Sequence, residues 1–314
     1  MKTLLYILAL SSALFANVHL GADQASCVEC HQTITKEFES SMHKNSSIYA
    51  DKVHNAVWNK HPLKAKGNYK CAKCHTPNAT TKEQQKQGIR CIECHTIKSL
   101  TSSDKKNLNN SSQNMCMSCH AINKNAHNFE LCRTDGFEEK NTKQNCITCH
   151  MPKVGDKEQH TFHGFAGARK HPQMLSKYVT LGIAKDATGF EISVKNEAPH
   201  TLLTHPLRVV QLRATLTRDS KKTKLKTHTF VRIIGRDGKP SMPWAANQIV
   251  KDNMIKGKEK RTIRFDEKLQ SGDKIKVSLG FFVVNPKAIK KLNLENEKEL
   301  KKFTILKSQF FYVK

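Results

Sequence analysis

The sequence has few aromatic residues and no long apolar segment after its first 15 residues. Phe, Trp and Tyr make up 7% of the 314 residues, and the hydrophobic residues together make up 38%. Side chains alone would therefore build only a lean core in the first half of the chain. No other long apolar segment follows, which predicts a soluble mature protein. The chain also lacks a recognisable acid/base pair, nucleophile triad or phosphate-binding loop.

Cysteine, by contrast, is abundant and regularly placed. Ten of the eleven cysteines belong to five C-x-x-C-H motifs: Cys27–His31, Cys71–His75, Cys91–His95, Cys116–His120 and Cys146–His150. This is the attachment motif of c-type haem, in which two thiols bond the porphyrin and the adjacent histidine is the proximal iron ligand. We therefore predict five covalent haem c groups. The attaching residues are Cys27, Cys30, Cys71, Cys74, Cys91, Cys94, Cys116, Cys119, Cys146 and Cys149, and the proximal ligands are His31, His75, His95, His120 and His150.

Structural zinc is the alternative interpretation, because paired C-x-x-C is also a zinc signature. Such a zinc site takes two cysteine pairs per metal, so five pairs would leave one over. Zinc also has no need of a histidine directly after every second cysteine. The five-fold recurrence of the complete motif favours haem.

The N-terminus is typical of a secretory leader. Lys2 precedes an apolar run from Leu4 to Phe15, and small residues follow. We predict a signal peptide over residues 1–22, cleaved between Ala16 and Ala22, and export to the periplasm. An uncleaved membrane anchor is the less favoured alternative, because the run is short for a bilayer span.

Basic residues outnumber acidic ones, above all in the second half. Residues 23–164 contain 20 Lys and Arg against 14 Asp and Glu, whereas residues 165–314 contain 32 against 13. A surface this basic attracts anionic partners. Export argues against nucleic acid, so we expect redox partner proteins with an acidic docking surface, or membrane headgroups. A membrane-bound quinol dehydrogenase is one such partner.

The pattern of the chain predicts a two-part fold. Residues 23–165 should form a pentahaem domain of short α-helices and loops, with helices at Thr33–His43 and Thr81–Gln87. Residues 166–314 should form a basic antiparallel β-sandwich, because short alternating strands recur there. The strands are expected at Tyr178–Ala184, Phe190–Lys195, Arg208–Thr217, Lys226–Gly235, Arg261–Phe265, Lys274–Val284 and Phe303–Val313. A turn is predicted at Gly235–Pro240 and one helix at Pro286–Leu300.

The chain after the predicted leader offers ten further histidines as second axial ligands: His43, His54, His61, His127, His160, His163, His171, His200, His205 and His228. Ten candidates for five irons favour bis-histidine coordination. Met42, Met115, Met117, Met151 and Met174 are alternatives, although methionine more often packs around a ring.

Several segments carry a resemblance to a known family. They are CVECHQTITKEFESSMH from Cys27, GIRCIECH from Gly88, CITCHMP from Cys146, HTFHGFAG from His160, and NEAPHTLLTHPLR from Asn196. Together they resemble the multihaem cytochromes related to the tetrahaem electron carrier of ammonia oxidisers, over about residues 27–218. Many exported relatives carry a β-domain after the last haem.

The resemblance implies that His43, His163 and His200 are distal iron ligands. His160 also fits the H-x-F-x-G pattern, and His205 is the substitute for His200, because relatives read Gly-His and then Pro-Thr-Gly in that segment. For the remaining haems, proximity in sequence leaves His54, His61 and His127 as candidates, with His61 and His127 preferred.

Cys132 is the eleventh cysteine and has no motif partner. A buried thiol is favoured over a redox-active or metal-binding thiol and over an intermolecular disulfide.

The sequence thus favours a periplasmic pentahaem carrier of electrons between a quinol-linked donor and a terminal redox partner. The alternative is a multihaem enzyme that acts on a small nitrogen or sulfur oxyanion at one open haem. Against it, every motif ends in His, whereas pentahaem nitrite reductases use Lys at the catalytic haem. A third reading, a basic β-domain that docks the haem domain onto a membrane complex, is compatible with the first.

Overall fold

The computed structural model describes residues 24–95, 115–120, 123–132, 145–203 and 205–314. The chain forms two compact units. The haem-motif unit contains the described residues among 24–55, 63–95 and 146–165. The β-unit contains those among 56–62, 116–145 and 166–314. The predicted two-part fold, with short helices first and antiparallel sheets second, is confirmed.

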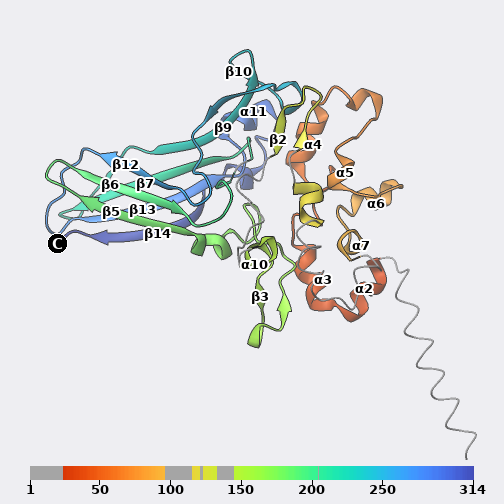
Figure 1. Ribbon diagram of the computed structural model, residues 1–314, viewed down its shortest axis with the longest axis horizontal. Helices are drawn as coiled ribbons and strands as arrows, with labels where there is room; N and C mark the ends of the chain where they lie inside the picture. The colour runs from red at the N-terminus through yellow and green to blue at the C-terminus, as the bar shows by residue number, and fades with distance from the viewer. Residues whose placement is uncertain (1–23, 96–114, 121–122, 133–144, 204) are drawn as a thin grey trace, which may run out of the picture. The chain divides into compact units, whose positions relative to one another are not determined.

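Short helices are the main secondary structure of the haem-motif unit (red to orange in Figure 1, with α10 in yellow-green). They are α2 (Gln24–Cys30), α3 (Gln32–Glu39), the first half of α4 (Lys52–Asn59), η2 (Lys64–Lys66), α5 (Ala72–His75), α6 (Lys82–Lys86), α7 (Cys91–Cys94) and α10 (Cys146–His150). The hairpin of β3 (Lys153–Val154) and β4 (His160–Thr161) and the turn η3 (Asp156–Glu158) complete it. The predicted helices at Thr33–His43 and Thr81–Gln87 are confirmed as the somewhat shorter α3 and α6. The latter starts with a capping box between Thr81 and Gln84.

The haem-motif unit has almost no side-chain core. Among its described hydrophobic residues only Phe38 is buried, and its ring packs edge-on against Phe165 with centroids 6.4 Å apart. The other buried side chains are small and polar: Ser41, Ser46, Ser47 and Thr76. This confirms the lean side-chain core that the composition predicts for this part of the chain.

Two antiparallel sheets form most of the β-unit (green to blue in Figure 1). The three-stranded sheet has the order β12 (Lys260–Phe265), β6 (Phe190–Asn196), β5 (Val179–Lys185). The seven-stranded sheet runs β10 (Lys239–Pro240), β9 (His228–Arg236), β7 (Val209–Arg218), β13 (Lys274–Phe282), β14 (Thr304–Tyr312). In addition, β11 (Gln248–Asp252) pairs with β9 and β8 (Lys221–Lys224) pairs with β7.

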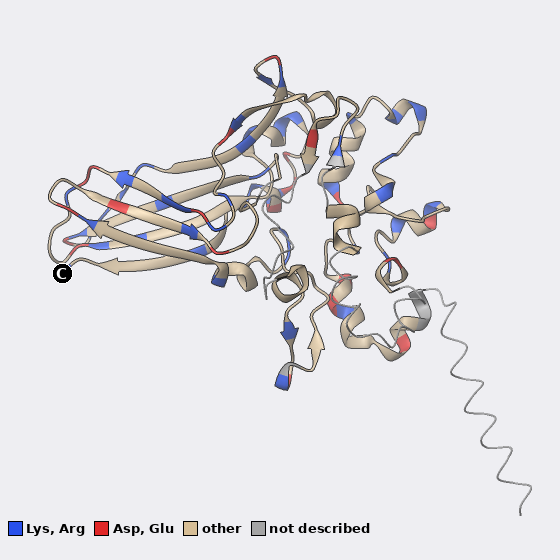
Figure 2. Ribbon diagram, in the orientation of Figure 1, with Lys and Arg blue, Asp and Glu red and all other residues tan. Residues whose placement is uncertain are grey.

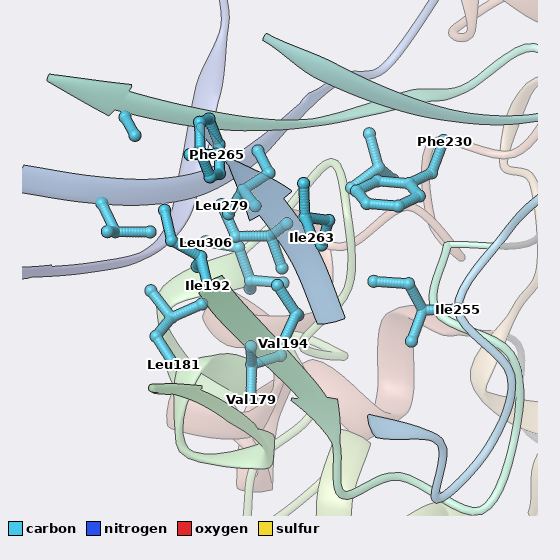
Figure 3. Packing of buried hydrophobic residues seen from close by; sticks show 14 of the residues in the cluster. Val179, Leu181, Ile192, Val194, Phe230, Ile255, Ile263, Phe265, Leu279 and Leu306 are labelled. Carbon is cyan, nitrogen blue, oxygen red and sulfur yellow. The ribbon is translucent and has the colours of Figure 1, made fainter. Parts of the chain in front are cut away.

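One hydrophobic core joins the two sheets. Ile192 of β6 and Ile263 of β12 meet Leu279 of β13 in the cluster shown in Figure 3. Along β13, Ile275, Val277, Leu279 and Phe281 are all fully buried and alternate with residues on the opposite face. Strands with one buried face specify their register strongly, because a shift by one residue would expose every core side chain.

The seven predicted strands agree with β5, β6, β7, β9, β12, β13 and β14 within about two residues at either end. The predicted turn is also present: Asp237 and Gly238, both with positive φ, join β9 to β10. Three short strands of the seven-stranded sheet were not predicted, namely β8, β10 and β11. All four residues of β8 are exposed, so its sequence carries no alternation to detect.

The single helix predicted over Pro286–Leu300 is wrong. The segment forms α11 (Pro286–Lys291) and, separately, the 3₁₀ turn η6 (Lys298–Lys301). Asn293 has φ of 57°, a left-handed conformation that asparagine tolerates and that ends a helix. The residues on either side, Leu292 and Leu294, are both buried, and this packing favours the break.

A segment after the fourth motif is fastened to the β-unit. It forms β1 (Asn123–Lys124) and β2 (Glu130–Cys132). The Asn125 side-chain amide donates to the main-chain oxygens of Pro243 (2.8 Å) and Ala246 (2.6 Å). The Arg232 guanidinium, 8% exposed, donates to the Glu130 and Leu131 carbonyls. The fourth motif therefore folds with the β-unit.

Candidate haem sites

The described C-x-x-C-H motifs lie on helical turns. The histidine amide donates to the carbonyl of the first cysteine at His31 (3.0 Å), His75 (3.1 Å) and His95 (2.9 Å). Residues 115–120 and α10 place the remaining two motifs in helices as well. Positions i, i+3 and i+4 share one face of a helix, so both sulfurs and the imidazole project to the same side. This geometry fits the attachment of one haem per motif.

None of the ten motif cysteines forms a disulfide in the structure. Nine are half-buried and Cys30 is exposed. Burial raises the pKa of the Cys71 and Cys91 thiols above its usual value. Within the described residues no three His, Cys, Asp or Glu side chains gather into a metal-binding group.

The main-chain oxygen of Ser46 orients two histidines at once. Nδ1 of His54 and Nδ1 of His75 each lie 3.0 Å from it. A carbonyl only accepts, so both rings carry their proton on Nδ1 and the lone pair on Nε2, which is the tautomer that ligates iron. The Ser46 hydroxyl also donates to the His75 carbonyl at 2.6 Å. Ser46 thus holds His75 of the second motif in place through both its carbonyl and its hydroxyl.

His54 lies beside His75. The ring centroids are 3.9 Å apart, and the shared acceptor holds both Nδ1 atoms on the same side. The Nε2 lone pairs of His54 and His75 therefore do not point at each other across a single iron position. Nε2 of His54 accepts from the Tyr69 hydroxyl at 3.2 Å. Burial lowers the pKa of His54 and raises that of Tyr69, which keeps both groups neutral.

His163 lies close to His95 of the third motif. Their ring centroids are 6.1 Å apart and the ring planes differ by 29°. Nδ1 of His163 donates to the Thr161 carbonyl at 2.7 Å, so the lone pair again lies on Nε2. The HTFHGFAG segment thereby presents this imidazole in the ligating tautomer.

His160 is engaged differently from His163. Its Nε2, the nitrogen that would bind iron, lies 2.9 Å from a Glu37 carboxylate oxygen. The other oxygen of Glu37 accepts from the main-chain amide of His163 at 2.9 Å. Glu37 therefore fastens the HTFHGFAG segment to α3, and His160 takes part in that support.

The same distinction separates His200 from His205. Nδ1 of His200 donates to the Thr201 carbonyl at 3.0 Å, which places its lone pair on Nε2. Nδ1 of His205 instead accepts from the Leu207 amide at 3.2 Å, so in the neutral ring the proton sits on Nε2. His205 is also exposed, whereas His200 is half-buried.

The other distal candidates are spread over both units. His43 packs edge-on against Phe165, with centroids 4.1 Å apart, and its carbonyl accepts from the Ile89 amide at 3.1 Å, just before the third motif. In the β-unit, His61 contacts both tryptophans of the chain, Trp58 at 5.4 Å and Trp244 at 4.8 Å between centroids.

Burial lowers the pKa of His61, so its ring stays neutral. His127, the remaining candidate, is exposed, and its main-chain amide donates to Asn125. The side chain of Cys132 lies outside the described residues.

Two buried hydroxyls adjoin proposed ligands. The side-chain oxygens of Thr76, next to His75, and Thr201, next to His200, have no hydrogen-bond partner among the described residues. Buried polar atoms are seldom left unsatisfied unless a bound group or water contacts them. Both positions therefore fit a prosthetic group with polar edges.

Three supporting residues had no signal in the sequence. Ser46, Glu37 and Tyr69 act on the histidines through contacts between segments up to 126 residues apart. Glu37 alone lies within a segment that carried the family resemblance, but its residue type does not reveal its two partners.

The comparisons agree with these geometric observations. The family model described as "Cytochrome c554 and c-prime" matches residues 26–96. The crystal structure of a penta-heme cytochrome c552 from Thermochromatium tepidum matches with a TM-score of 0.76 at 19% identity, covering 93% of this chain and 99% of that one. The first three haem-attachment motifs therefore lie in a segment that matches a multihaem c-type cytochrome model, and the fold of the chain is that of a penta-heme cytochrome c.

The similarity to the solved structure extends over both parts of the fold. A second structure, the curli protein CsgC of E. coli, aligns over 42% of this chain and 95% of its own with a TM-score of only 0.21 at 8% identity. No curated protein matches the chain.

Proposed function

We propose that this cytochrome holds five covalent haem c groups and carries electrons between a quinol-linked donor and a terminal redox partner. The observation that carries the proposal is the shared hydrogen bonding of His54, His75, His163 and His200. Each donates its Nδ1 proton to a main-chain carbonyl. When bound, haem c supplies a one-electron couple at its iron. The chain's part is to fix the ligands, their tautomers and the solvent access.

The proximal ligands are the five motif histidines, and the distal set is His43, His61, His127, His163 and His200. His163 is assigned to the iron of His95, because the two rings are near one another and close to parallel. His200 is preferred to His205 and His163 to His160, since only the preferred member of each pair has its lone pair on Nε2. His54 remains the substitute candidate for the distal ligand role given to His61 or His127.

The cellular setting follows from the chemistry and the leader. Covalent haem attachment takes place beyond the cytoplasmic membrane, so the protein is exported to the periplasm. No helix in the described residues is long and apolar enough to cross a bilayer. The basic β-unit suits partners with an acidic docking surface, such as a membrane-bound quinol dehydrogenase.

Haem counting tests the proposal. The protein should be produced with a c-type maturation system and assayed as its pyridine haemochrome together with its intact mass. Five haems per chain are expected, with reduction in several one-electron steps. Replacement of Cys146 and Cys149 by Ala should remove one haem and leave four. A zinc-containing protein, or fewer than five haems in a fully matured sample, would contradict the proposal.

A further inference from the structure

The outer face of the seven-stranded sheet carries positive charge without acidic residues. The strand register places the side chains of this face in rows. Thr217, Lys274 and Tyr312 lie side by side in one row, and Thr215, Lys276 and Phe310 in the next. On β8, Lys222 pairs with Thr217 and Lys224 with Thr215. Both rows are therefore made of lysines, short hydroxyl side chains and aromatic rings.

Two large rings stand exposed among these lysines. Phe310 is 47% and Tyr312 70% exposed on β14, the last strand in the pairing order of this sheet. The Lys274 ammonium lies 4.3 Å from the centre of the Phe310 ring and 5.3 Å from that of Tyr312. The alternate positions of the strand, Phe311 and Val313, pack against the core. The strand register therefore turns both rings away from the core, and they take no part in its packing.

We propose that this outer face, defined by Lys222, Lys224, Lys274, Lys276, Phe310 and Tyr312, binds the surface of an anionic lipid bilayer. The exposed rings are of a kind that protein interfaces also use, but the four lysines are not, because lysine is depleted at protein interfaces. Lysines attract anionic headgroups as point charges that need no matched geometry. Exposed Phe and Tyr rings insert at headgroup level, where one end is apolar and the other wet.

The distribution of charge on this face favours binding to an anionic surface. None of the residues in the two rows is acidic, whereas Asp273, beside Lys274, is buried and paired with Arg218. Figure 2 shows more Lys and Arg than Asp and Glu over the strands of the β-unit as a whole. Binding at this face would keep the cytochrome close to membrane-bound redox partners, but it does not depend on electron transfer.

Vesicle co-sedimentation of the full holoprotein tests the inference. The vesicles contain one part phosphatidylglycerol to two parts phosphatidylcholine, and vesicles of phosphatidylcholine alone serve as the reference. We expect binding to the anionic vesicles that weakens as NaCl is raised, and none to the reference vesicles. Because each lysine near an anionic surface contributes a roughly fivefold gain in binding, Lys274→Gln with Lys276→Gln should weaken it by about 25-fold.

A matched control removes the same charge elsewhere in the β-unit. Lys290 and Lys291 are exposed on α11, and K290Q with K291Q should change binding by less than about twofold. Phe310→Ser with Tyr312→Ser should weaken binding even at high salt, with unchanged haem absorbance as evidence of folding. Equal losses for the two lysine pairs would overturn the proposal. So would the absence of any anionic vesicle binding, an outcome that would point to an acidic protein as the occupant.

Discussion

At the scale of single residues, the ring nitrogen that each histidine uses for hydrogen bonding separates the ligand candidates. The segment from His160 to Gly167 offers two histidines that fit one pattern, and sequence alone gave only a slight preference. The structure adds that Glu37 occupies Nε2 of His160, whereas His163 bonds through Nδ1. A tautomer is set by partners that are distant along the chain, so no local pattern could reveal it.

Replacement of His163 by Ala should leave one iron without its distal ligand. We expect one of the five haems to become high-spin and to bind added cyanide or nitric oxide, as measured by electron paramagnetic resonance. His160→Ala is the matched control: it removes a neighbouring imidazole and should leave all irons low-spin. The assignment would be reversed if H160A, and not H163A, produced the high-spin signal.

Glu37 has a positioning role that is separable from its charge. Glu37→Gln keeps one oxygen acceptor, whereas Glu37→Ala loses the bonds to both His160 and the His163 amide. We expect E37A to broaden the low-spin signal of one haem and to shift its reduction potential, with a much smaller shift in E37Q. Potentiometric titration of both variants checks this. Identical shifts would show that charge, and not the position of His163, is what matters.

At the scale of elements, the sequence predicted the buried strands well and the exposed ones poorly. Strand β6 alternates buried residues with more exposed ones, and β13 has buried apolar side chains at every second position over Ile275–Phe281, which leaves a clear signal. The exposed β8 leaves none, and β11 contains a register irregularity between Ile249 and Lys251. The single helix expected over Pro286–Leu300 is interrupted at Asn293. The positive φ of that residue accompanies the packing of the leucines on either side of it.

Gly88 is expected to be intolerant of any side chain. Its φ is 70°, and a Cβ there would collide with the Lys44 carbonyl and lie 2.9 Å from the His43 oxygen. Gly88→Ala should therefore lower the free energy of unfolding by about 1–3 kcal/mol and disturb the His43 haem. Gly67→Ala is the control, since Gly67 also has positive φ but has open space around it. It should cost roughly 1 kcal/mol, and equal losses in denaturant titrations would argue against the collision.

The ion pair between β7 and the start of β13 should make the β-unit acid-sensitive. Arg218 donates to both oxygens of the buried Asp273 (2.9 and 2.6 Å) and holds the pKa of that carboxyl below its usual value. A carboxyl with a depressed folded-state pKa stabilises the fold above its unfolded pKa of about 4, and this contribution is lost as pH falls further. Asp273→Asn should lower the Tm at pH 7 and abolish this part of the acid dependence. An unchanged Tm at pH 7 would contradict the role of the pair.

At the scale of the whole molecule, the two units differ in what stabilises them. The β-unit has a continuous core of buried side chains, whereas the haem-motif unit buries a single hydrophobic one, Phe38. The sequence predicted this contrast through composition and motif recurrence. It did not predict that the fourth motif folds with the β-unit, because Asn125 and Arg232 reach their partners across about 100 residues or more.

Haem attachment should therefore be required for folding of one unit only. In protein produced without a maturation system, hydrogen exchange should show protection of β6, β7 and β13 and little protection of α3, α5 and α7. The same measurement on the holoprotein should show both units protected. Equal protection of both units in the haem-free chain would mean that side chains suffice to fold the haem-motif unit.

The most direct test of the account is electron paramagnetic resonance of the fully oxidised holoprotein, recorded alone and after addition of nitrite or nitric oxide. Five bis-histidine irons in an electron carrier predict low-spin signals only, unchanged by either ligand. A high-spin signal that responds to nitrite or nitric oxide would contradict the account and would establish instead an enzyme with one open haem.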